Sequence, residues 1–146
     1  MILDNLTEFA DAQTVTATAI SDVIDLGAAP TLQDIGNGQP LYLVLTCDET
    51  AGSGGGSATV NFSLESDSTA NLATSATVHA STGAIGQASL VAGTFKRVIP
   101  LPVEVRYERY LGVRFTVASG PLTAGKFSAF LTLDPHGWVA LPDASS

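Results

Sequence analysis

Residues 97–134 read RVIPLPVEVRYERYLGVRFTVASGPLTAGKFSAFLTLD, and this stretch decides the fold class of the chain. Apolar side chains alternate with polar or small ones along residues 110–118, and again along residues 127–133. Strict alternation over this length is typical of a β-strand with one buried face. Residues 97–103 are expected to form a third strand, although two prolines interrupt it. Turn residues between the last two strands (SGPLTAGK) support a β-rich unit.

The same signals continue toward the N-terminus. Short β-prone runs occupy residues 14–20, 22–26, 41–47 and 58–65. Residues 66–94 contain few large apolar side chains, so one or two short strands with long loops are expected there. No segment keeps the 3.6-residue apolar period of an amphipathic helix. The sequence therefore predicts an all-β fold, a single antiparallel β-sandwich or jelly roll of about eight strands.

A length of 146 residues favours one domain. We assign residues 14–134 to the jelly-roll domain. Residues 1–13 are predicted to be an N-terminal arm, either one helical turn or extended. Their apolar residues recur every third position but over too short a length for an independent helix. Phe9 is then a candidate contact residue, because an apolar arm needs cover from the core or from a partner.

The charge is strongly acidic and unevenly distributed. The formal net charge is -8 and the isoelectric point is about 4.3. All six basic residues lie at or after Lys96, whereas ten of the fourteen acidic residues lie before it. Binding to nucleic acid or to an anionic membrane is not expected, because both require cationic surfaces.

No catalytic or metal-binding pattern is visible in the sequence. The two histidines, His79 and His136, are isolated, and no cluster has metal-site spacing. The carboxylate pairs at residues 22/25 and 48/49 border turns and lack the aromatic cleft of a glycosidase. Cys47 lies in an apolar run, which favours a buried structural thiol over a nucleophile. We therefore expect no enzymatic activity, no cofactor and no metal.

The richest side-chain chemistry lies in RYERYLGVR, residues 106–114. Arginine and tyrosine are enriched in interface hot spots because they combine a large contact area with directional donors. The alternative is a local role, with arginines paired to nearby carboxylates and tyrosines capping the core. Trp138, in an expected C-terminal tail of residues 135–146, is either a core plug or an interface anchor. The candidate contact residues are Phe9, Arg106, Tyr107, Arg109, Tyr110, Arg114 and Trp138.

Three groups of residues carry a resemblance to a known family. They are the opening MILDNLTEFADAQTVTATAIS followed by VIDLGAA, the middle segment DIGNGQPLYLVL, and the final segments ERYLGVRFTV and TAGKFSAFLTLD. In this order they span most of the chain, from Met1 to Asp134. The chain resembles the cement proteins of tailed-phage capsids, specifically the family typified by the cement protein of Bordetella phage.

This resemblance implies a jelly-roll protein that binds the outside of an icosahedral shell built from a coat protein with an HK97-like fold. It would bridge neighbouring capsomers and reinforce the shell against internal DNA pressure. A homodimer is implied, with a trimer as the alternative. The implied location is the outer capsid surface of the virion, after synthesis in the bacterial host cytoplasm. No enzymatic activity or cofactor comes with the family.

A second hypothesis is a carbohydrate-binding, lectin-like jelly roll displayed on a virion. It requires an exposed aromatic platform for a sugar ring. The chain has one tryptophan and three tyrosines, which leaves little aromatic surface for that purpose. Binding to a panel of glycans would distinguish it from the capsid hypothesis.

Overall fold

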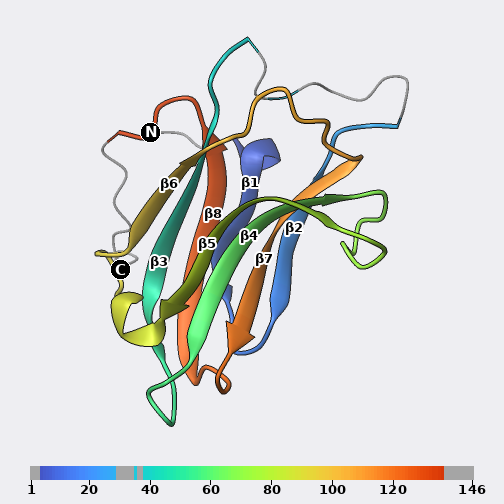
Figure 1. Cartoon of the computed structure of the whole chain (residues 1–146). Coiled ribbons are helices and arrows are strands. Elements are labelled where there is room, and N and C mark those ends of the chain that lie inside the picture. Colours follow the sequence, from blue (N-terminus) through green and yellow to red (C-terminus); the bar gives the residue numbers. More distant parts are fainter. Residues whose placement is uncertain (1–3, 29–34, 36–37, 137–146) are drawn as a thin grey trace.

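Two antiparallel sheets face each other in the computed structural model, which describes residues 4–28, 35 and 38–136 (Figure 1). Each sheet has four strands in this described part. The strands are β1 (Glu8–Thr14), β2 (Ala19–Asp25), β3 (Tyr42–Gly52), β4 (Thr59–Asp67), β5 (Thr77–Gly86), β6 (Lys96–Pro100), β7 (Tyr110–Ala118) and β8 (Ala124–Thr132). Two short 3₁₀ turns, η1 (Asn5–Thr7) and η2 (Gln87–Ser89), complete the elements of the described part.

The strand order is β1-β8-β3-β6 in the first sheet and β2-β7-β4-β5 in the second. The pairs β1 with β8, β2 with β7, β3 with β6 and β4 with β5 are all antiparallel. The chain therefore pairs its first strand with its last and continues inward, like one long hairpin folded over on itself. The predicted antiparallel β-sandwich is confirmed, and this nested order is the strand connectivity of a jelly roll.

The core lies between the two sheets, where the alternating apolar side chains meet. The ring of Phe62 on β4 lies 5.6 Å from that of Phe115 on β7 and 5.2 Å from that of Phe127 on β8, both edge-to-face. Burial of each phenylalanine side chain stabilises the folded state by about 1.5–3 kcal/mol relative to leaving it exposed. Each edge-to-face pair adds about 0.5–1.5 kcal/mol. Cys47 is fully buried, and burial raises the pKa of its thiol to about 11. This confirms the predicted buried thiol.

The predicted N-terminal arm is wrong for residues 8–13, which belong to β1 inside the first sheet. The pairing of β1 with β8 is irregular between Glu8 and Ala10 and between Ala10 and Gln13. Ala12 also has a positive φ of 46°. These irregularities break the period of two in the sequence, so the strand has no alternating signature.

Other strand limits differ from the predictions as well. The structure has one strand, β2, where two were predicted over residues 14–26. β3 continues to Gly52, beyond the β-prone run that was predicted to end at residue 47. Residues 66–94, where few large apolar side chains occur, contain the end of β4 and one further strand, β5. β7 has the predicted limits, residues 110–118.

The outer face of the second sheet is partly covered, which the sequence did not indicate. Alternation places Ser63 and Glu65 of β4 on the solvent side of that sheet. Both are nevertheless buried, with only 4% and 5% of their surface exposed. The loop between β4 and β5 passes over this side, as the contacts of its Leu72 show.

Candidate interaction surface

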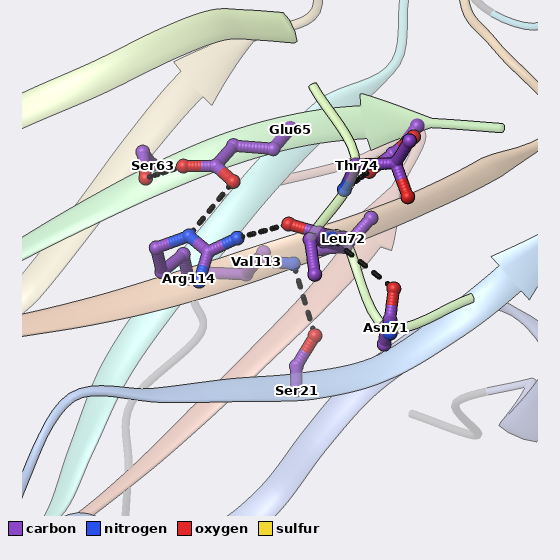
Figure 2. A network of polar contacts seen from close by, with 10 residues as sticks. Ser21, Ser63, Glu65, Asn71, Leu72, Thr74, Val113 and Arg114 are labelled. Carbon is purple, nitrogen blue, oxygen red and sulfur yellow. Dashed lines mark hydrogen bonds and ion pairs between the residues drawn. The ribbon is translucent and has the colours of Figure 1, made fainter. Parts of the chain in front are cut away.

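A largely buried ion pair between Glu65 and Arg114 lies beneath the loop between β4 and β5, on the outer face of the second sheet (Figure 2). Nε of Arg114 donates to Glu65 Oε2 at 2.9 Å, and the Ser63 hydroxyl donates to Glu65 Oε1 at 2.8 Å. The other arm of the guanidinium, Nη2, donates to the carbonyl oxygen of Leu72 at 2.5 Å. Both carboxylate oxygens of Glu65 thus have donors, which offsets the cost of burying a charge. These hydrogen bonds connect β4, β7 and the loop to one another.

The loop of residues 68–76 is ordered by its own hydrogen bonds as well. The backbone N–H of Thr74 donates to Asp67 Oδ2 at 2.9 Å, and that of Ala73 donates to Asn71 Oδ1 at 3.2 Å. Leu72 is only 1% exposed and packs over Gly112 of β7. The loop therefore presents a fixed surface.

A second polar cluster lies where β2 ends and β7 begins. Arg109 makes a bidentate pair with Asp25, from Nε to Oδ1 at 2.9 Å and from Nη2 to Oδ2 at 2.8 Å. Its guanidinium carbon lies 4.9 Å from the centre of the Tyr110 ring. The side chains of Arg109 and Asp25 are 43% and 46% exposed. The fork geometry and the stacking fix the arginine in one orientation while leaving it accessible.

The hydrogen bond from Arg109 is the main cause that lowers the pKa of Asp25 to about 2, followed by the backbone N–H of Gly27. The carboxylate is therefore ionised across the physiological pH range. An arginine held in this way loses little side-chain entropy when a partner binds to it.

Tyr107 points inward instead of contributing to this surface. It is 4% exposed, and its hydroxyl donates to the carbonyl oxygen of Pro102 at 3.0 Å. Its ring lies edge-to-face 4.6 Å from His79 of β5, whose Nε2 lies 2.6 Å from the hydroxyl of Ser66. Burial lowers the pKa of His79, against the effect of Glu108. A serine next to a histidine resembles a catalytic dyad, but Ser66 is fully buried and its hydroxyl does not face solvent.

The structure divides the predicted contact residues into three groups. Arg106 and Arg109 are exposed and Tyr110 is half-buried, and all three lie within residues 106–110, before and at the start of β7. Arg114 is 27% exposed and engaged with Glu65. The prediction for Tyr107 is wrong, because its side chain is buried in the sandwich. Phe9 is also buried, at 1% exposed, but it lines the groove between β1 and β2. Trp138 lies outside the described residues.

Two features of the surface were missed from the sequence. One is the loop of residues 68–76, whose only signal was a single leucine among small and polar residues. The other is a groove between β1 and β2, which required β1 to be recognised as a strand. Both features depend on contacts between segments distant in the sequence, which spacing alone does not show.

No group of three or more His, Cys, Asp or Glu side chains suited to hold a metal ion occurs within residues 4–28, 35 and 38–136. In that same part of the chain, no helix has the length and apolar character needed to cross a membrane.

Comparison with known proteins gives one family match. A family model described as Bbp16 matches residues 9–131. This range runs from the second residue of β1 to the penultimate residue of β8, so it covers the whole sandwich. None of the curated proteins matches the chain.

Proposed function

Because this chain belongs to the Bbp16 family, the Bordetella phage family that its sequence resembles, we propose that it binds the outside of an icosahedral capsid as a structural virion protein. It joins neighbouring capsomers and so cements the shell against the pressure of the packaged DNA. The observation that carries this proposal is the family match over residues 9–131, which includes all eight strands of the described part. The partner is a coat protein with an HK97-like fold.

The surface at the start of β7 supports this proposal. Asp25 holds Arg109 in place, and Arg109 stacks on the half-buried Tyr110. Arg106 is exposed nearby in the sequence. Pre-ordered arginine and tyrosine side chains are the residue types that dominate interface energies. We propose that this surface makes one contact with the capsid.

Cementing follows from mass action. A ligand that binds the assembled shell but not its free subunits stabilises the shell by RT ln(1 + [L]/Kd). A homodimer that touches two capsomers gains further affinity, because the second contact forms at a high effective concentration. We propose a homodimer for this reason, with a trimer as the alternative.

The test is co-sedimentation of the purified protein with mature, undecorated shells of its phage. We expect binding that saturates at a fixed ratio of this protein to coat protein, and no binding to free coat subunits. Absence of binding by the folded protein would overturn the proposal. A glycan array measured in parallel tests the lectin-like alternative.

Binding alone does not establish cementing, so a second measurement is needed. Calorimetry of shells with increasing amounts of the protein should show the melting temperature of the shell rising until the sites are filled. A saturated shell that melts at the temperature of the bare shell would contradict a cementing role while leaving attachment intact.

A further inference from the structure

A groove of about 710 Å³ lies between β1 and β2, which are the edge strands of the two sheets. In Figure 1 these are the two blue strands. The groove is lined by core side chains, among them Phe9 and Leu26, each 1% exposed, and Leu131, 5% exposed. Leu6 of η1 also lines it and is 76% exposed. The groove thus offers apolar contacts from core side chains next to an exposed leucine.

Four carboxylates line the same groove: Glu8, Asp11, Asp22 and Asp25. No lysine or arginine occurs among the described residues that line it. Arg109 pairs with Asp25, whereas the other three carboxylates have no ion-pair partner among the described residues. Burial and the neighbouring charge of Asp11 raise the pKa of Glu8. The groove thus combines apolar core side chains with a negatively charged rim.

The backbone of the two strands is also available. Among the described residues, β1 is bonded to β8 alone and β2 to β7 alone, so each keeps an outer row of backbone N–H and C=O groups there. Such edges bind extended chains by strand addition. At one end, the side-chain amide of Gln13 donates to the carbonyl oxygen of Ile20 at 2.9 Å and ties the strands together. The parts of β1 and β2 that line the groove are residues 8–11 and 22–25. Their length is that of about four residues of an extended partner segment.

We propose that this groove binds an extended segment of the coat protein in which lysine or arginine alternates with apolar side chains. In an extended chain, alternate side chains point to opposite sides, so apolar ones meet the core residues while basic ones meet the rim. A second copy of this chain is disfavoured, because its own β1 and β2 carry the same acidic residues. The choice of the coat protein rests on the proposed function, whereas the chemistry of the segment rests on the groove alone.

The first test uses defined peptides and the isolated protein. A six-residue peptide of alternating lysine and leucine is titrated into protein with labelled methyl groups, and a glutamate–leucine peptide serves as the control. We expect saturable NMR shifts at Leu26 and Ile24 with the basic peptide only. No shift at these methyl groups, or equal shifts with both peptides, would overturn the inference.

Matched variants separate the groove from the overall charge. The double variant Asp11→Asn with Asp22→Asn should bind the lysine–leucine peptide roughly 2–30-fold more weakly, since an exposed ion pair is worth ~0.2–1 kcal/mol. The control, Glu49→Gln with Glu104→Gln, removes the same charge outside the residues that line the groove. Equal weakening in both variants would mean that only the net charge matters, which contradicts a specific site.

The second test uses shells and identifies the occupant. A photo-cross-linking amino acid at position 6 should react with a coat segment that contains lysine or arginine. Cross-links to a second copy of this chain would contradict the proposed occupant. If shells bind wild type and the Asp11→Asn, Asp22→Asn variant equally, the groove inference fails and the proposed function stands. If shells bind neither protein, the proposed function fails, and the peptide titration still decides what the groove binds.

Discussion

At the scale of single residues, Gly112 shows how close the packing is on the outer face of the second sheet. A Cβ atom there would lie 3.0 Å from Leu72 Cδ1 and 3.0 Å from Val23 Cγ1. Leu72 anchors the loop between β4 and β5, and Val23 belongs to the neighbouring strand β2. The lack of room for a side chain thus explains why glycine occupies this position.

We expect Gly112→Ala to lower the free energy of unfolding by about 1–3 kcal/mol, the usual cost of overpacking. Urea denaturation followed by circular dichroism measures it. Gly54→Ala is the matched control, because no atom lies within 4 Å of its added Cβ and its φ is not positive. Equal free energies of unfolding for the Gly112→Ala variant and wild type would show that the loop moves aside without loss of stability, which contradicts the prediction.

The pair of Asp25 and Arg109 gives a prediction about pH. The variant Arg109→Gln should raise the pKa of Asp25 from about 2 toward its ordinary value of 3.8, because the main cause of the shift is removed. The stabilisation from this pair is present above pH 3.8 and is lost as the pH falls toward 2. Wild type and Arg109→Gln should therefore differ in stability near neutral pH and converge at the acid end.

An NMR titration of the side-chain carboxyl groups measures this shift. Asp134 is an internal control, because its lowered pKa depends first on the backbone N–H of His136. Its pKa should be the same in both proteins. An unchanged pKa of Asp25 in the variant would assign the shift to Gly27 alone.

Residue types alone could not predict which aromatic residues face outward. The sequence singled out Tyr107 and Tyr110 together, yet the first is buried and the second half-buried beside Arg109. Alternation fixes the direction of a side chain only inside a regular strand. Tyr107 precedes β7, in an irregular segment where Glu104 has a φ of +60°. Its direction is set by contacts with His79 and Pro102 that come from the fold.

At the scale of elements, the ion pair of Glu65 and Arg114 ties β4 to β7 beneath the loop. Arg114→Met should lower the free energy of unfolding by about 2–4 kcal/mol, because it leaves a buried carboxylate without its cation. The double variant Glu65→Leu with Arg114→Met should recover most of this loss. A double-mutant cycle by urea denaturation measures the coupling between the two residues. Additive effects of the two single changes would contradict an essential pair.

The elements also differ in how well the sequence predicted them. β7 lies in the interior of its sheet with one apolar face in the core, so its limits were clear from alternation. β5 is an edge strand with most of its side chains exposed or half-exposed, and few of them needed to be apolar. β1 is interrupted by irregular pairing. Burial produces the pattern that sequence analysis reads, so weakly buried or irregular edge strands were missed or only weakly indicated.

At the scale of the whole molecule, the proposed capsid contact can be tested with one double variant. Arg109→Ala with Tyr110→Ala should weaken binding to shells ~5-fold or more, the effect expected for residues in an interface hot spot. Co-sedimentation measures the affinity, and circular dichroism should show an unchanged fold.

A suitable control for this experiment is Arg97→Ala. Arg97 also stacks on an aromatic ring, with its guanidinium carbon 5.9 Å from the centre of the Phe95 ring, but it lies on β6 in the opposite sheet. Its loss should leave shell binding unchanged. If both variants weaken binding equally, the contact is not confined to the surface at the start of β7.

The nested strand order has a consequence for biosynthesis. β8 lies between β1 and β3, so the first sheet cannot close until residues 124–132 have left the ribosome. Most contacts join segments far apart in the chain, which slows folding and favours completion after translation. A nascent chain stopped before β8 would leave β1 without a partner and one side of β3 open, two edges prone to aggregation. Chains that stop before β8 should therefore aggregate or be degraded more readily than complete ones.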